Sequence, residues 1–296
     1  MTDQLDIATP TRTREILEKY NLNAKKSLGQ NFIIDSNILR KMVDTGDVDA
    51  DTTVIEIGPG IGALTEQIAK AAKEVFAFEI DDRFLPVLKE TLSPYSNVTV
   101  YHQDILEVDF KAFQNEYLQD TTRLLVIANL PYYITTPIIM HLLESDLPVE
   151  MMLLMMQKEV ASRLNAEPST KAYGSLSIAI QYYTEVDIAF TVPPTVFNPQ
   201  PNVDSAVIKL TVREQPAVEV KDDKLFTTIV RASFKQRRKT IWNNLRKALG
   251  NKEREEELRA AFEKAGIDPS RRGESLSILE FAALANAFYA ADLIEF

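Results

Sequence analysis

The sequence contains no cysteine, and only two of its 296 residues, His102 and His141, are histidine. Disulfides, thiolate nucleophiles and the usual structural zinc sites are therefore excluded, and we expect neither a histidine-based triad nor a metal site. No apolar run reaches the ~18 to 20 residues that span a bilayer, and the first dozen residues lack the apolar core of a signal peptide. We predict a cytoplasmic protein whose chemistry relies on carboxylates, amides, aromatic rings, backbone groups or a borrowed cofactor.

The acidic net charge of -10, taken alone, opposes a nucleic-acid partner. The charge is unevenly distributed, because residues 221–296 contain 15 Lys and Arg against 12 Asp and Glu. A basic surface can therefore coexist with an acidic whole. The 45% of hydrophobic and 26% of charged residues are typical of a globular protein, and the length suffices for one large and one small domain.

Strand-like and helix-like segments alternate through the first two-thirds of the chain, after a short helix at 11–20 and a helix start at Asp35. Short apolar strands are predicted at 54–57, 75–80, 98–101, 124–128 and 151–156, and helices at 64–72, 84–92, 137–143 and 160–164. This alternation predicts an α/β fold with a mostly parallel sheet that is covered by helices on both faces.

The pattern changes toward the end of the chain. Residues 178–190 and 203–212 predict a strand-rich ending to the sheet, with the proline-rich segment 192–202 between them. Beyond Pro216 the spacing is helical, and Ser277 with Glu280 forms a capping box. We therefore predict an N-terminal extension at 1–24, a sheet domain at 25–215 and a small all-α domain at 216–296.

A glycine-rich loop follows the first predicted strand of the sheet. Gly58, Gly60 and Gly62 match the pattern G-x-G-x-G in EIGPGIGALT, where glycine lets the backbone turn sharply and approach a ligand closely. Alone the loop is a weak signal, because a tight turn or a nicotinamide or flavin site fits it equally well.

Two carboxylates follow the next two strands. Glu79 lies 21 residues after Gly58, and a carboxylate there can accept both hydrogen bonds of a ribose diol. Asp104 also ends a strand; it can accept a bond from an adenine amino group, although taken alone it is better read as a turn cap. Together with the loop, they indicate an adenosine-bearing ligand and leave NAD and S-adenosylmethionine open.

The motif Asn129-Leu130-Pro131-Tyr132 follows the fourth predicted strand and suggests methylation of an aryl amine. An aryl amine is a poor nucleophile because its lone pair is delocalised, so an enzyme that methylates it must hold the amine hydrogens with fixed acceptors. The side-chain oxygen of Asn129 and the carbonyl of Leu130 can do this, while Pro131 stiffens the turn. Tyr132 offers a ring on which an extruded base can stack.

These motifs together resemble the ribosomal RNA small-subunit adenine dimethyltransferase family. The likeness extends from about Lys25 to the last helix through KKSLGQNFIID, VIEIGPGIGALT, FEID, QDIL, NLPYYITTPI, MMQKEVASRL, YGSLSI, VFNPQPNVDSAVIKL and FKQRRKTIWNNL. The resemblance implies a Rossmann-like class I methyltransferase sheet of seven strands and a small helical C-terminal domain. It also implies dimethylation, with S-adenosylmethionine, of two neighbouring adenines in a hairpin near the 3′ end of small-subunit ribosomal RNA, a step in subunit biogenesis.

The resemblance also assigns roles to residues. The implied cofactor contacts are Asn31, Ile33, Gly58, Gly60, Glu79, Ile80, Asp104, Ile105 and Asn129. The implied catalytic set that holds the target adenine is Asn129, Leu130, Pro131, Tyr132 and Phe197, with Phe197 as a second aromatic wall. Isoleucine at position 33, where relatives often have leucine, is a small departure.

The segment Phe234 to Lys239 gathers positive charge. On a helix, Lys235, Arg237, Arg238 and Lys239 would form a basic face, which Lys25 and Lys26 could extend. A charge run is more often a solvated face, but an RNA substrate favours phosphate contact. We expect a monomer that acts on ribosomal RNA or on an assembling small subunit.

Four other functions remain open at this point. A nicotinamide oxidoreductase would carry out hydride chemistry and would leave Asn129 to Tyr132 without a role. A DNA adenine methyltransferase would usually carry Pro-Pro-Tyr where this chain has Leu-Pro-Tyr. The antibiotic-resistance dimethyltransferases of large-subunit RNA share much of the chemistry and are the runner-up. An assembly or transcription factor could keep the fold without catalysis.

Overall fold

The computed structural model describes residues 5–22, 30–130, 134–248 and 254–293, and contacts divide the chain into two units. The first contains residues 1–161 and 187–212, and the second contains 162–186 and 213–296. Residues 162–186 were predicted to lie in the sheet domain, but they belong to the second unit. They group with the C-terminal helices because Tyr173, Ile178 and Tyr182 share a core with Phe226 and Phe281.

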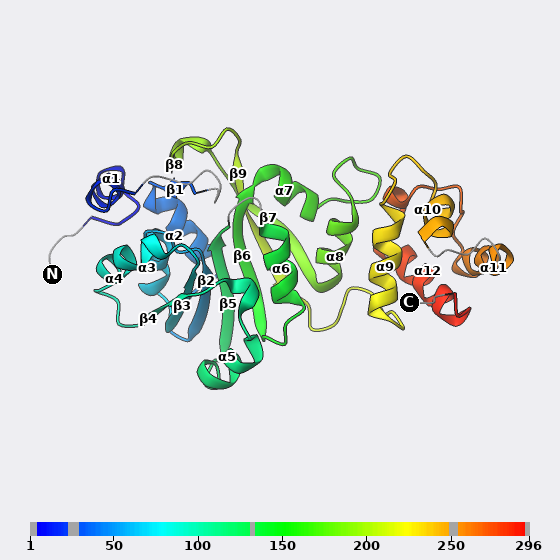
Figure 1. Ribbon diagram of the computed structural model, residues 1–296, viewed down its shortest axis with the longest axis horizontal. Helices are drawn as coiled ribbons and strands as arrows, with labels where there is room; N and C mark the ends of the chain where they lie inside the picture. The colour runs from blue at the N-terminus through cyan, green and yellow to red at the C-terminus, as the bar shows by residue number, and fades with distance from the viewer. Residues whose placement is uncertain (1–4, 23–29, 131–133, 249–253, 294–296) are drawn as a thin grey trace. The chain divides into compact units, whose positions relative to one another are not determined.

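A seven-stranded sheet with the order β4-β3-β2-β5-β6-β9-β7 forms the framework of the first unit (Figure 1). The strands are β2 (Thr52–Ile57), β3 (Glu74–Glu79), β4 (Val98–His102), β5 (Arg123–Asn129), β6 (Val149–Gln157), β7 (Thr184–Val192) and β9 (Ser205–Val212). The five strands β4, β3, β2, β5 and β6 pair in parallel, and β9 pairs antiparallel with β6. The predicted mostly parallel sheet is confirmed.

Helices cover both faces of this sheet, because the strands carry apolar side chains on alternate sides. Val54, Val75 and Leu125 pack in one core with α1 (Pro10–Lys19), α2 (Ser36–Thr45), α3 (Ala63–Ala69) and α4 (Leu85–Thr91). On strand β3, Phe76 and Phe78 instead meet Phe113 of α5 (Phe110–Tyr117), with ring centroids 5.2 and 5.5 Å apart. The helices α6 (Thr135–Leu143) and α7 (Lys158–Leu164) follow β5 and β6.

The remaining elements of the first unit are short. A second sheet pairs β1 (Phe32–Ile33) antiparallel with β8 (Phe197–Asn198). The 3-10 helices among the residues described for this unit are η2 (Asp82–Phe84), η3 (Ile105–Glu107) and η4 (Pro194–Val196). The predicted helix start at Asp35 is confirmed, because its carboxylate accepts a hydrogen bond from the Asn37 amide at 2.9 Å.

The second unit is helical around its own core. Its helices are α8 (Ser175–Tyr183), α9 (Asp223–Ser233), α10 (Ile241–Ala248), α11 (Glu255–Ala265) and α12 (Ile278–Ala290), with the 3-10 helix η5 (Gly273–Ser275). The capping box of Ser277 and Glu280 opens α12 as predicted. Among the described residues, no helix combines the length and the apolarity needed to cross a bilayer.

Two predicted elements are wrong. Residues 175–183 form helix α8 and not a strand, and β7 begins only at Thr184. Short apolar runs fit a buried helix as well as a strand. At the start of this helix the Ser177 hydroxyl accepts a hydrogen bond from the Gly174 amide at 3.1 Å. The basic segment 234–239 is a turn after α9, which ends at Ser233, and is not a helix.

Candidate active site

A pocket opens at the carboxyl ends of the parallel strands, next to the glycine-rich loop. Its walls come from the segment before α2, from the ends of β2, β3, β4 and β5, and from α3 and α6. In a parallel sheet, ligands bind at this edge of the strands. The predicted cofactor contacts Asn31, Ile33, Gly58, Gly60, Glu79, Ile80, Asp104, Ile105 and Asn129 all line this pocket.

The glycine-rich loop turns through a conformation that other residues rarely adopt. Gly58, Gly60 and Gly62 have φ angles of +69°, +58° and +87°, in the left-handed region where a Cβ is costly. A Cβ on Gly62 would lie 3.1 Å from side-chain atoms of Thr91 and Leu92, whereas one on Gly58 would meet nothing within 4 Å. Gly62 is therefore needed for packing, and Gly58 leaves space in the pocket.

Glu79 ties the loop to the end of β3. Its carboxylate accepts a hydrogen bond from the Gly60 amide at 3.0 Å and one from the Asp81 amide at 2.8 Å. The side chain is buried, and this burial raises the pKa of Glu79 despite the two amide donors. A carboxylate fixed in this way lies ready to accept hydroxyl donors from a ligand in the pocket.

Glu56, at the end of β2, is a second carboxyl group in the pocket wall that motif reasoning passed over. It is 1% exposed, and burial raises its pKa to about 8. Its Oε2 atom is buried and finds no hydrogen-bond partner in the described part of the chain. A signal was present in the sequence, since this acid stands inside an otherwise apolar strand directly before the glycines.

The ends of β3 and β4 supply the far wall of the pocket. Asp104 caps η3, because its Oδ1 accepts from the Leu106 amide at 3.0 Å, so the capping role and the pocket position coexist in one residue. Ile105 beside it is buried, while Ile80 is 56% exposed. An exposed isoleucine at a pocket rim offers apolar surface to a flat ligand.

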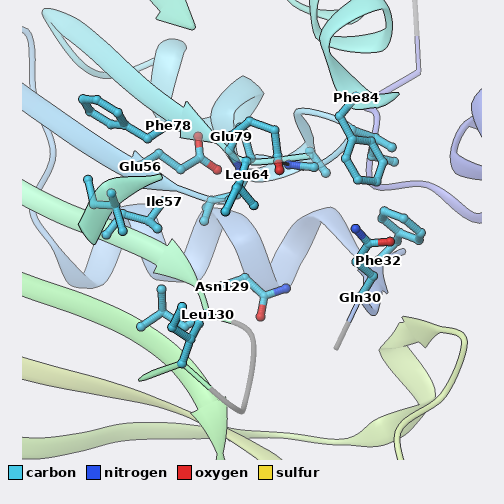
Figure 2. A pocket seen from close by; sticks show the side chains of 18 of the residues that line it. Gln30, Phe32, Glu56, Ile57, Leu64, Phe78, Glu79, Phe84, Asn129 and Leu130 are labelled. Atoms are coloured by element: carbon cyan, nitrogen blue, oxygen red, sulfur yellow. Dashed lines mark hydrogen bonds between the residues drawn. The ribbon is translucent and has the colours of Figure 1, made fainter. Parts of the chain in front are cut away.

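Asn129 and Leu130 lie where β5 ends, across the pocket from the carboxylates. Figure 2 shows the Asn129 amide directed into the space between Glu79 on one side and Gln30 and Phe32 on the other. The chain is fixed at this point because the Leu130 amide donates to the Met155 carbonyl of β6 at 3.1 Å. Pro131 and Tyr132 lie outside the described residues.

Phe197 does not line this pocket. Its ring is 2% exposed and packs in the core that also contains Phe32 and Ile33. Residue 197 pairs with Ile33 across the β1–β8 ladder, so the strand that carries it is attached to the segment that carries Asn31. Phe197 is thus connected to the pocket by the pairing of β8 with β1, which carries the lining residue Ile33.

The predicted RNA contacts lie in different surroundings. Lys235, Arg238 and Lys239 are exposed, and their side chains form no ion pair with the described residues. Arg237, in contrast, donates to the carbonyls of Lys171 and Tyr173 at 3.1 and 3.0 Å and pairs with a carboxylate at 3.2 Å. Arg237 thus fastens the second unit internally. Lys25 and Lys26 lie outside the described residues.

Sequence reasoning missed much of the apolar lining. Besides Glu56, the pocket is lined by Gln30, Phe32, Leu64, Phe78, Phe84, Gln103, Ile134 and Ile138. All of them except Phe84 stand within the motifs that carry the family resemblance, but nothing in their residue types assigned them a role. Only the fold shows that their side chains line the pocket.

The strand order, the antiparallel β9 and the glycine-rich pocket at the carboxyl edge define an α/β enzyme of the Rossmann-like class I methyltransferase type. The sequence model of the family described as ribosomal RNA adenine dimethylase matches residues 21–289. The chain belongs to this family, and it is an RNA adenine methyltransferase.

Similar proteins cover nearly the whole chain. "Ribosomal RNA small subunit methyltransferase A" of Geobacillus kaustophilus is 61% identical over 95% of this chain and 97% of its own length. The protein of the same name from Enterococcus faecalis is 59% identical over 97% of this chain and 98% of its own.

Two solved structures share the fold. A dimethyladenosine transferase from Plasmodium falciparum is 24% identical, with a TM-score of 0.71 over 88% of this chain and 98% of its own. The 23S rRNA methyltransferase ErmE is 25% identical, with a TM-score of 0.64 over 87% of this chain and 99% of its own. The predicted fold class is confirmed.

Proposed function

We propose that this enzyme uses S-adenosylmethionine to convert two adjacent adenines in the 3′-terminal hairpin of small-subunit ribosomal RNA to N6,N6-dimethyladenine. The observation that carries the proposal is that Asn129 and Leu130 line the same pocket as Glu79 and the glycine-rich loop. Names of relatives that are 59 to 61% identical point to the small subunit. Such an enzyme acts in the cytoplasm, on free RNA or on an assembling subunit, and needs no partner chain.

The pocket fits the methyl donor in three respects. Gly58 leaves open space for close approach, the Glu79 carboxylate is held where it can accept the ribose hydroxyls, and the exposed Ile80 can cover one face of the adenine ring. Asp104 and Ile105 then bound the adenine, while Asn31 and Ile33 close the opposite side. When bound, S-adenosylmethionine supplies an electrophilic methyl group.

The chain's own residues position the nucleophile. The Asn129 side-chain oxygen and the Leu130 carbonyl accept the two hydrogens of the adenine amine, which favours a more tetrahedral nitrogen with its lone pair directed at the methyl group. An amide is no general base at neutral pH, so rate acceleration rests mainly on alignment. Tyr132 stacks on the extruded base in this proposal, a contact worth ~1 to 3 kcal/mol.

Two further roles belong to the proposal. Phe197 bounds the base site from strand β8, after a rearrangement that exposes its ring. Lys235, Arg238 and Lys239 contact phosphates, together with Lys25 and Lys26, and each such contact contributes to a salt-dependent affinity. Arg237 supports that surface from within, because its guanidinium is engaged with the chain.

The test compares Asn129→Ala with Asn115→Ala, which removes an exposed amide of helix α5. Both are incubated with labelled methyl donor and with small subunits from cells that lack the methylation, and the labelled bases are mapped by nuclease digestion. We expect the wild type and Asn115→Ala to label two adjacent adenines twice each. We expect Asn129→Ala to lose at least ~100-fold in rate while still binding the subunits.

Other results would change the proposal. Labelling of a large-subunit RNA fragment in preference to small subunits would make the enzyme a resistance-type dimethyltransferase. Full activity of Asn129→Ala would remove the amide from the mechanism. Tight binding of NAD and none of S-adenosylmethionine would overturn the choice of cofactor.

A further inference from the structure

A hydrogen-bonded cluster of three side chains lies beside the pocket. The Arg83 guanidinium contacts both carboxylate oxygens of Asp81, with Nε 2.9 Å from Oδ1 and Nη2 2.6 Å from Oδ2. Gln30 completes the cluster, because its Nε2 donates to Asp81 Oδ2 at 3.0 Å and its Oε1 accepts from Arg83 Nη2 at 3.3 Å. The Asp81 side chain is 2% exposed, and the Arg83 hydrogen bonds hold its pKa well below the usual range.

On one side this cluster is joined to the cofactor site. The Asp81 amide donates to Glu79 Oε1 at 2.8 Å, and Glu79 Oε2 in turn accepts from the Gly60 amide at 3.0 Å. Three consecutive hydrogen bonds therefore lead from the glycine-rich loop through Glu79 and Asp81 to Gln30. A ligand that binds the Glu79 carboxylate acts on the first member of this series.

On the other side the cluster is joined to the strand that carries Phe197. Gln30 stands two residues before β1, where Ile33 pairs with Phe197, and the Ile34 amide donates to the Val196 carbonyl at 2.8 Å. Side-chain packing also connects segment 30–34 to the cluster. The Phe32 ring contacts the Phe84 ring edge-on, with centroids 5.9 Å apart, and the Arg83 guanidinium lies against the Phe84 ring. Segment 30–34 thus lies between the cofactor pocket and β8 and contacts both.

We propose that Gln30, Asp81 and Arg83 are positioning residues that couple occupancy of the cofactor pocket to the position of strand β8 and of Phe197. The proposal rests on the proposed function, since it takes Glu79 as the ribose ligand. Asp81 and Arg83 form the fixed part, because a bidentate guanidinium–carboxylate pair has a defined geometry. Gln30 transmits that geometry to segment 30–34, and its amide fits because it donates to the carboxylate and accepts from the guanidinium at once.

The test measures hydrogen exchange with and without S-adenosylhomocysteine, the product of the donor, at concentrations that calorimetry shows to be saturating for each protein. The main variant is Gln30→Ala, which cuts the link but leaves the Asp81–Arg83 pair intact. Gln119→Ala is the matched control, since it removes an exposed glutamine with a single hydrogen bond of 3.3 Å, outside the pocket lining. Arg83→Lys is a second variant that keeps the charge but loses the fork.

In the wild type and in Gln119→Ala, we expect the ligand to slow exchange about tenfold both in the glycine-rich loop and in residues 194–198. In Gln30→Ala and Arg83→Lys, we expect slowing in the loop alone. The same ligand-dependent protection of 194–198 in Gln30→Ala would overturn the coupling, as would its absence from the wild type. If the wild type does not bind the ligand at all, the proposed function itself fails, and the coupling fails with it.

Discussion

Replacing Glu56 with glutamine is expected to stabilise the ligand-free protein at neutral pH and to have little effect at pH 5. Glu56 is fully buried in the pocket wall, and burial raises its pKa from 4.5 to about 8. The pKa of Glu56 is higher in the folded protein than in the unfolded chain. Folding therefore takes up a proton at any pH between 4.5 and about 8. The free energy of unfolding of the wild type therefore falls as the pH rises through that window. Glutamine carries no such proton.

The magnitude follows from the size of the shift. One pKa unit corresponds to ~1.4 kcal/mol, so a shift from 4.5 to about 8 limits the total loss to roughly 5 kcal/mol above pH 8. Between pH 5 and pH 7.5 the same relation gives a loss of about 3 kcal/mol. Glu56 is only 1% exposed, so water does not screen its charge and the full pKa shift contributes to the free energy of unfolding.

Urea denaturation followed by circular dichroism at pH 5 and pH 7.5 measures this difference. Glu116→Gln, an exposed change on helix α5, is the control for the loss of one negative charge. The stability of Glu56→Gln relative to the wild type should rise by about 3 kcal/mol between the two pH values, and that of Glu116→Gln should stay nearly constant. Parallel pH profiles for the wild type and Glu56→Gln would refute the assignment of a buried, protonated carboxyl group.

Four further variants test the packing and the basic surface. Gly62→Ala should destabilise the protein by ~1 to 3 kcal/mol in urea, because φ is +87° and the new Cβ would lie 3.1 Å from its neighbours. Leu153→Ala, in the middle of β6 at 0% exposure, should cost ~2 to 5 kcal/mol in the same assay. Lys235→Gln with Arg238→Gln should lower the slope of log affinity for RNA against log salt by ~1 per residue without changing the thermal midpoint, whereas Arg237→Gln should lower that midpoint.

The sheet could be predicted because its strands follow simple rules. Apolar runs such as 124–128, separated by helical spacing, locate the parallel strands, and β5 is found at Arg123–Asn129. Helix α8 was missed because the short apolar stretches of 175–183, interrupted by Ser175, Ser177 and Gln181, are compatible with either structure. The basic turn at 234–239 was missed because a charge pattern does not reveal where α9 ends.

The proposed cofactor half of the candidate site was predictable for a related reason. Gly58, Glu79 and Asp104 follow three consecutive strands that pair in parallel, so their positions along the sequence fix their positions in space. Glu56 was missed although an acid inside an apolar strand is a signal in the sequence, because its burial and its raised pKa become known only from the structure. Whether a charged side chain is free or engaged also depends on contacts between segments that are distant in sequence, as Arg237 shows in the second unit.

The proposed base-binding half is different, because it joins segments that are far apart in sequence. Asn129 stands in the middle of the chain and Phe197 later, and a two-residue ladder between β8 and β1 attaches Phe197 to the early segment that carries Asn31 and Ile33. No local pattern encodes this ladder, so only the structure shows that segment 30–34 contacts both halves of the site. Enzymes that use the same methyl donor on different RNAs can share the first half. Differences in substrate choice are therefore expected to lie in the second half, in β8 and in the residues that hold it.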